Sequence, residues 1–223
     1  MNVTKRSKNK MKKNLPKITI GLVIFALFVS FSYLVHKDLF TQLDFDTTVK
    51  LQDKLPRSVD GLFSFFSLIG TAEIVGIFLL VIIAIRRKLR LVLALPAFIT
   101  LHIIELFGKA FVNHLPPPHF LLRTEKLVDL PQFYVRLENS YPSGHAARAA
   151  FISAILILLF AKSKKISQNQ KIIFCLLIIV YNVIMFSSRI YLGEHWLSDV
   201  IGGVLLGASL GLISLIFVKF KDL

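Results

Sequence analysis

Negative charge and cysteine are the two features of which this sequence has little. Its 223 residues include 13 acidic against 27 basic ones, and the formal net charge is +14. Cys175 is the single cysteine and lies in an apolar run, so an intrachain disulfide is excluded. Such a surplus of positive charge is common in nucleic-acid-binding proteins, and only the positions of the charges can decide whether that class applies.

Apolar residues, by contrast, are abundant: they make up 55% of the chain, and the mean hydropathy is +0.68. Several apolar stretches approach or exceed the roughly 20 residues that a helix needs to cross a bilayer. The predicted spans are about Ile18–Val35, Leu62–Ile85, Leu91–Val112, Gly144–Ala161, Ile172–Ile190 and Leu197–Val218. The sequence therefore predicts an all-α fold, a polytopic membrane helix bundle with six transmembrane helices.

The positive charges are concentrated on one side of this six-span arrangement. Most lysines and arginines precede the first span, separate the second from the third and the fourth from the fifth, or follow the last. Asp222 is the only acidic residue on that side. This asymmetry is typical of cytoplasmic loops and predicts cytoplasmic N- and C-termini in a plasma membrane. A nucleic-acid partner is excluded, because such a protein would not place its charges at alternate ends of apolar helices.

The remaining segments follow from the same topology. Residues 1–17 are expected to form a basic cytoplasmic tail, and 18–223 a single membrane domain. The tail and first span resemble a signal peptide, but the apolar stretch is long and has no convincing cleavage site, which favours an uncleaved span. Segments 36–61, 113–143 and 191–196 are expected outside, the first with a short amphipathic helix at the interface.

Ionisable side chains gather at the outer ends of four predicted spans. Because such groups are costly in a bilayer, they are first interpreted as functional. They are Lys109 on the third span, His145 and Arg148 on the fourth, Arg189 at the end of the fifth, and His195 and Asp199 at the start of the sixth. The pattern predicts an active site on the extracytoplasmic side; the alternative is an ion-pair network that only holds helices together.

The residue types indicate phosphoryl chemistry. Ser143 and Gly144 begin a helix, whose backbone N–H groups and dipole favour an anion. His195 and Asp199 stand four residues apart on one helix face, so the carboxylate can orient the imidazole. His145 beside the anion site can exchange a proton. Together they suit phosphoryl transfer through a phosphohistidine.

A metal site is the competing use of two histidines and an aspartate. A divalent cation would be poorly placed among Lys109, Arg148 and Arg189. The sequence also lacks the histidine and carboxylate clusters that are typical of zinc or paired metals. We therefore expect no metal and no other cofactor.

Two motifs resemble those of the type-2 phosphatidic acid phosphatase superfamily, which also includes vanadium haloperoxidases. They are Pro142-Ser143-Gly144-His145, and Ser188-Arg189 followed by His195 and Asp199. The resemblance implies that His195 attacks phosphorus, Asp199 orients it, and His145 protonates the leaving group and later activates water. It further implies, without a metal, a cradle for the phosphoryl oxygens made of Lys109, Ser143, the Gly144 amide and Arg189.

The first motif of that superfamily, Lys with Arg-Pro after six residues, is altered. Pro116 stands where the arginine is expected. Our hypothesis is that Arg148 supplies the lost phosphate contact, with Arg123 next; the alternative is that Arg148 pairs with Glu105. Glu105 itself is expected to have a supporting role, through an ion pair with Lys109 four residues later.

The expected function is a metal-independent phosphatase that acts on lipid phosphate or diphosphate esters in the bilayer. Undecaprenyl diphosphate is the favoured substrate, followed by phosphatidylglycerophosphate or phosphatidic acid. Two alternatives remain: a lipid phosphotransferase that uses the same residues, and a non-catalytic phospholipid-binding membrane protein.

Overall fold

Every regular element in the computed structural model is a helix within the residues that it describes, which are 2–86, 89–124 and 138–214. The α-helices are α1 (Asn2–His36), α2 (Thr41–Lys54), α3 (Asp60–Ile69), α4 (Ala72–Arg86), α5 (Ala94–Phe111), α6 (Gly144–Lys162), α7 (Gln168–Tyr191) and α8 (Leu197–Ser214). Short 3-10 helices cover Arg57–Val59, Leu89–Leu93 and His119–Leu121. The predicted all-α bundle is confirmed, and the predicted end of the last span at Val218 lies outside the described residues.

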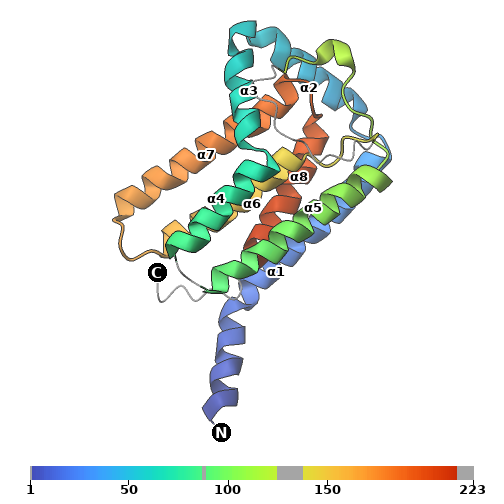
Figure 1. Ribbon diagram of the computed structural model, residues 1–223. Helices are drawn as coiled ribbons and strands as arrows, with labels where there is room; N and C mark the ends of the chain where they lie inside the picture. The colour runs from blue at the N-terminus through green and yellow to red at the C-terminus, as the bar shows by residue number, and fades with distance from the viewer. Residues whose placement is uncertain (1, 87–88, 125–137, 215–223) are drawn as a thin grey trace.

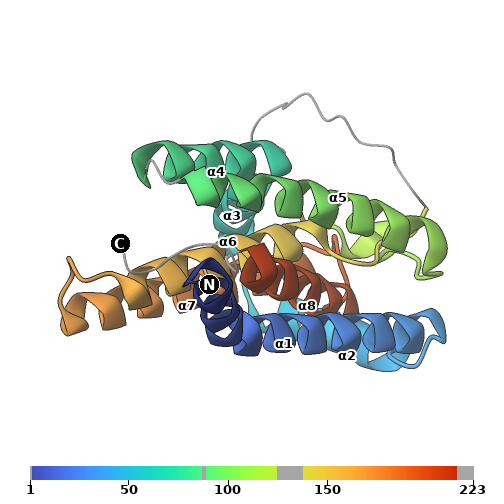
Figure 2. The ribbon, with the colours of Figure 1, turned by 90° about the horizontal axis from the view of Figure 1, so that it is seen from below.

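The bundle is built around α8, which packs most extensively on α6 and α1 and also contacts α5. Figure 1 shows α2 and the start of α8 at one end of the bundle, and the N-terminus and the α6–α7 connection at the other. Seen from below in Figure 2, α8 lies between α1 and α6. Many large apolar side chains of α1, α4, α5 and α7 are exposed in the described residues, as expected for helices that face lipid.

Within the described part of the chain, five helices are long and apolar enough to cross a membrane: α1, α5, α6, α7 and α8. The prediction of one continuous helix from Leu62 to Ile85 was wrong, because α3 ends at Ile69, α4 begins at Ala72, and the chain bends there by 54°. The two halves together form a sixth candidate span. The break falls at Gly70, where a Cβ would come within 2.9 Å of the His145 ring. The bend thus brings backbone against a predicted catalytic residue.

Small residues on α8 allow its close approach to α6. A Cβ on Gly203 would lie 2.3 Å from the Ser143 carbonyl oxygen, and one on Gly207 would lie 1.9 Å from the Ala147 carbonyl oxygen. One on Gly211 would lie 2.8 Å from Phe151 O. The four-residue spacing of these glycines thus permits close packing, which holds the start of α8 beside the start of α6.

The amphipathic helix predicted within 36–61 is α2, but its orientation is unusual. Its buried residues are the polar Asp44, Thr48 and Gln52, spaced four apart, whereas Leu43 and Phe45 are exposed. The Gln52 amide donates to the carbonyls of Leu121 and Tyr191, both at 2.7 Å. The polar face of α2 therefore binds the end of the bundle at which α6 and α8 begin, and its apolar residues Leu43 and Phe45 point away.

Candidate active site

The start of α6 and the start of α8 are joined directly. Ser143 is the N-cap of α6, and its hydroxyl oxygen accepts a hydrogen bond from the Ala146 N–H at 3.5 Å. The Ser143 N–H donates to the backbone carbonyl of Asp199 at 3.0 Å. This contact fixes one predicted phosphate-binding turn against the predicted His–Asp pair.

His195 and Asp199 form the pair that their spacing predicts. The His195 Nδ1 lies 3.3 Å from Asp199 Oδ2, and the same oxygen accepts the Trp196 N–H at 3.0 Å. Asp199 is fully buried. With Nδ1 turned to the carboxylate, Nε2 is the nitrogen that carries a lone pair for another partner.

The second histidine, His145, follows Ser143 on the first turn of α6. Its Nδ1 lies 3.5 Å from Arg148 Nη2. The side chains that act electrostatically on its ring are Arg189 of α7, Arg148 of α6, Lys109 of α5 and His195 in the turn before α8. The structure therefore brings together the residues that the sequence placed at four outer helix ends.

Glu105 holds two of these cations with one carboxylate. Its Oε1 accepts from Lys109 Nζ at 3.0 Å, and its Oε2 accepts from Arg148 Nη1 at 3.0 Å. A Cβ on Gly144 would lie 2.0 Å from Glu105 Oε1, so only glycine fits there. The ion pair of Lys109 with Glu105 is as predicted, and the same carboxylate reaches the N-terminus of α6.

Arg148 adopts the pairing that was kept as the alternative to a phosphate contact. Besides the ion pair with Glu105, its Nε donates to the Gly70 carbonyl oxygen at 3.0 Å. The side chain is buried. The guanidinium thus connects the bend between α3 and α4 to the His145 ring, and this holds the ring in position. A contact of Arg148 with a phosphate remains a prediction.

Arg123, the second proposed substitute for the missing arginine, lies between α2 and the end of α7. Its Nη1 donates to the Gln52 carbonyl oxygen at 3.2 Å and to the Tyr191 hydroxyl at 3.1 Å. The guanidinium also stacks over the Tyr191 ring, 5.1 Å from its centroid. These contacts hold the outer loop, and a role of Arg123 in phosphate binding remains a prediction.

Arg189 is fully buried at the end of α7. Its Nη1 pairs with Glu194 Oε2, and its Nε and Nη2 both lie 3.4 Å from Ser188 Oγ. The Glu194 Oε1 also accepts from the Thr124 hydroxyl at 2.6 Å. Sequence reasoning missed Glu194, although its place five residues after Arg189 and next to His195 was a usable signal.

A second polar cluster, also missed, lies behind Asp199. Asp44 accepts hydrogen bonds from the Ser198 N–H at 2.8 Å and the Ser198 hydroxyl at 2.6 Å. His114 Nε2 lies 3.1 Å from Ser198 Oγ. Burial raises the pKa of the Asp44 carboxyl above its ordinary value, against the opposing effects of the Ser198 hydrogen bonds and the His114 charge. The polar residues spaced four apart from Asp44 to Gln52 could have indicated this buried face.

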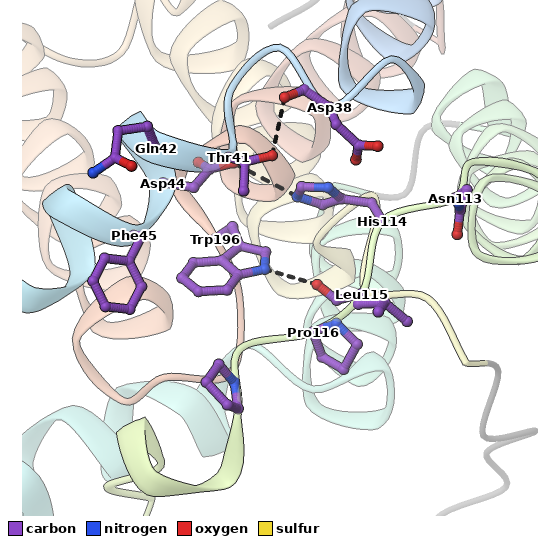
Figure 3. Close-up of a pocket in the computed structure, with 11 residues that line it drawn as sticks. Asp38, Thr41, Gln42, Asp44, Phe45, Asn113, His114, Leu115, Pro116 and Trp196 are labelled. Atoms are coloured by element: carbon purple, nitrogen blue, oxygen red, sulfur yellow. Dashed lines mark hydrogen bonds and ion pairs between the residues drawn. The ribbon is translucent and has the colours of Figure 1, made fainter.

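Part of this cluster lines a pocket of about 600 Å³ at the end of the bundle that carries α2. Figure 3 shows His114 pointing toward Asp44, with Trp196 beside them. The Trp196 indole N–H donates to the Leu115 carbonyl oxygen at 2.7 Å. Pro116, which stands where the altered motif would carry its arginine, also lines this pocket. Within the described part of the chain, no group of three or more histidine, cysteine, aspartate or glutamate side chains is arranged to hold a metal ion.

Two curated proteins resemble parts of this sequence. Phosphatidylglycerophosphatase B of Bacillus subtilis is 34% identical over 83 residues, which are 37% of this chain and 39% of that protein. Undecaprenyl-diphosphatase of Sulfolobus acidocaldarius is 32% identical over 136 residues, 61% of this chain and 58% of that protein. The chain thus matches less than two thirds of the length of either relative.

Two crystal structures share the fold. That of the first transmembrane PAP2 type phosphatidylglycerolphosphate phosphatase from Bacillus subtilis has a TM-score of 0.71 and 20% identity, covering 87% of this chain and 93% of that one. That of Aquifex aeolicus LpxE has a TM-score of 0.57 and 25% identity, covering 78% and 94%. The chain is accordingly a multi-pass integral membrane protein.

The sequence also matches a family directly. Residues 87–222 match the PAP2 superfamily, and this range is more than half of the chain and includes both intact motifs. The helical bundle and the contact between the starts of α6 and α8 are consistent with this match. The protein belongs to the PAP2 superfamily.

Proposed function

We propose that this protein is a metal-independent phosphatase that hydrolyses lipid phosphate or diphosphate esters through a phosphohistidine on His195. The observation that carries the proposal is the link from the Ser143 N–H to the Asp199 carbonyl, which holds the His–Asp pair beside the N-terminus of α6. A nucleophile, its orienting carboxylate, a second histidine and an anion-binding turn thereby share one site.

In the first step, the lone pair on His195 Nε2 attacks phosphorus, and the bond from phosphorus to the leaving oxygen breaks. Asp199 accepts the Nδ1 proton in a hydrogen bond and stabilises the charge that develops on the ring. His145 donates its proton to the leaving oxygen. Lys109, Arg189, the Ser143 hydroxyl and the Gly144 backbone N–H neutralise the phosphoryl oxygens, since a helix N-terminus favours an anion.

In the second step, a water attacks the phosphorus of the phosphohistidine, and the bond from phosphorus to Nε2 breaks. His145, now without its proton, accepts one from this water, so both histidines return to their starting states. Arg148, held by Glu105 and the Gly70 carbonyl, keeps the His145 ring in place during both steps. The products are the dephosphorylated lipid and inorganic phosphate.

We favour undecaprenyl diphosphate as substrate, followed by phosphatidylglycerophosphate or phosphatidic acid. The likeness to undecaprenyl-diphosphatase extends over 61% of this chain, against 37% for phosphatidylglycerophosphatase B. A site at helix ends suits a lipid whose head group enters the protein while its chains stay in the bilayer. We further propose that the site faces away from the cytoplasm, as the distribution of basic residues indicates.

The test measures phosphate release by the purified full-length protein in detergent, with EDTA present and without an acceptor alcohol. Undecaprenyl diphosphate, phosphatidylglycerophosphate and phosphatidic acid are compared. His195→Ala is expected to reduce release by at least about 10³-fold, since it removes the nucleophile. His119→Ala is the matched control, because His119 is exposed on the outer segment.

Full activity of the His195→Ala variant would overturn the mechanism. Loss of all wild-type activity in EDTA would instead require a metal. Phosphate release only when an acceptor alcohol is added would favour the phosphotransferase. A wild-type protein that binds these lipids and releases no phosphate would support the non-catalytic alternative.

A further inference from the structure

His114 lies behind the His195–Asp199 pair, outside the motifs that define the site. Its Nε2 is 3.6 Å from Asp199 Oδ1, 3.6 Å from Asp44 Oδ2 and 3.1 Å from Ser198 Oγ. All four residues are buried. Three oxygens from two helices, α2 and α8, therefore surround one ring nitrogen.

The hydrogen bonds around Ser198 define what this nitrogen does. The Ser198 hydroxyl donates its single proton to Asp44 Oδ2 at 2.6 Å. It can then only accept from His114, so Nε2 carries a proton and is the donor. A donor thus stands between the Asp44 and Asp199 carboxylates, which would otherwise repel each other.

Asp199 has an unsatisfied oxygen on the side that faces His114. Its Oδ2 accepts from Trp196 N–H and faces His195 Nδ1, whereas Oδ1 is buried without a hydrogen-bond partner among the described residues. A carboxylate held by one oxygen can rotate about its last torsion. The nearby donor on His114 favours the orientation of the Asp199 carboxylate in which Oδ1 faces His114 and Oδ2 faces the His195 ring.

We propose that His114 is a positioning residue for catalysis, which holds the second oxygen of Asp199 and thereby the orientation of the His195 imidazole. This inference rests on the proposed phosphatase function. Asp44 belongs to the same arrangement, because it accepts hydrogen bonds from Ser198. It also faces His114 from α2, as Figure 3 shows.

The backbone around His114 is itself fixed. Its N–H donates to Asn139 Oδ1 at 3.0 Å, and its carbonyl oxygen accepts from the Ser140 N–H at 2.9 Å. Ser140 comes just before the motif that contains Ser143 and His145. The segment that carries the phosphate-binding turn thus also sets the position of His114. The turn and the His114–Asp199 contact are therefore held in a fixed position relative to each other.

The experiment compares three variants of full-length protein in detergent, each normalised to the folded, monodisperse fraction. His114→Gln keeps an amide N–H near the position of Nε2. His114→Asn carries the same amide on a side chain that is too short to reach Asp199, and His114→Leu has no donor. We expect kcat to fall by on the order of 10²-fold in the last two, with KM within about twofold of wild type. His114→Gln should retain kcat within about threefold of wild type. His119→Leu, on the same outer segment, is the control and should match wild type.

A double-mutant cycle adds a readout that a purely structural role would not produce. If His114 acts through Asp199, His114→Asn should reduce kcat far less in an Asp199→Asn background than in wild type. Additive losses would overturn the proposal, as would wild-type kcat in His114→Asn. A rise in KM with unchanged kcat would also overturn it and make His114 a substrate-binding residue. If His114→Leu does not fold, the Gln and Asn variants still decide the matter.

The two proposals fail in different ways. A wild-type protein that releases no phosphate from any lipid phosphate overturns the phosphatase function and this inference together. Normal wild-type activity with an unaffected His114→Asn variant overturns the role of His114 alone.

Discussion

Glu105 is a buried carboxylate that joins three parts of the candidate site. It binds Arg148 through one oxygen and Lys109 through the other, and it lies against the position where Gly144 has no Cβ. A buried charge is tolerated when a partner and hydrogen bonds satisfy it. Glu105 therefore ties the cations of α5 and α6 to the start of α6.

We predict that Glu105→Ala lowers the free energy of unfolding by about 3–5 kcal/mol, because it leaves the buried Arg148 guanidinium without its carboxylate. Lys109→Met should cost about 1 kcal/mol or less, because that side chain is 22% exposed and solvent screens its ion pair. Denaturant unfolding of the purified protein in micelles measures both. Equal losses in the two variants would contradict the assignment of Glu105 as the partner of a buried charge.

Among the elements, α6 and α8 form the rigid frame of the site. Their contact is backbone against backbone at Gly203, Gly207 and Gly211, and in a bilayer such close packing supplies much of the attraction between helices. Because Ser143 and Asp199 stand at the outer ends of these two helices, their hydrogen bond depends on the spacing that the glycines allow.

Gly207→Ala is expected to destabilise the protein by about 1–3 kcal/mol or more, since its Cβ would meet the Ala147 carbonyl at 1.9 Å and force the helices apart. Phosphate release should fall with it. Gly76→Ala in α4 is the matched control, because its Cβ would only contact the Phe98 ring at 3.7 Å. Its expected effect ranges from neutral to about 1 kcal/mol of stabilisation. Denaturant midpoints in micelles compare the two, and an undisturbed Gly207→Ala variant would mean that this packing is not tight.

For the whole molecule, the ends of the bundle differ in charge and in chemistry. The connection from α6 to α7 carries Lys164 and Lys165, whereas the opposite end carries α2, the candidate site and its pocket (Figure 1). From the positive-inside rule we propose that the first end faces the cytoplasm. A lipid head group would reach His195 from the other side.

This topology predicts the labelling of single cysteines in a Cys175→Ala background. Leu39→Cys, at a position that is 65% exposed just before α2, should react with a membrane-impermeant maleimide in intact cells. Lys164→Cys, exposed between α6 and α7, should react only after the cells are lysed. The reverse pattern would place the site on the cytoplasmic side.

The sequence alone determined the membrane class, most span positions and the residues of the two intact motifs. These features are local: a span needs about 20 consecutive apolar residues, and His195 and Asp199 stand only four residues apart across the start of α8. The pairing of Glu105 with Lys109 was predictable for the same reason. Pro116 likewise revealed the altered first motif directly.

Only the tertiary structure decided how residues from different helices pair. Arg148 had two possible partners in the sequence, and the bend at Gly70 together with the approach of α5 gave it Glu105 and a backbone carbonyl. The single span predicted over Leu62–Ile85 was bent, because Gly70 lets the chain pass close to His145. Asp44 and His114 meet Ser198, the neighbour of Asp199, across 154 and 84 residues of sequence, and no local period reports such contacts. Helix periodicity fixes which face a side chain occupies, but the packing of the helices fixes what that face meets.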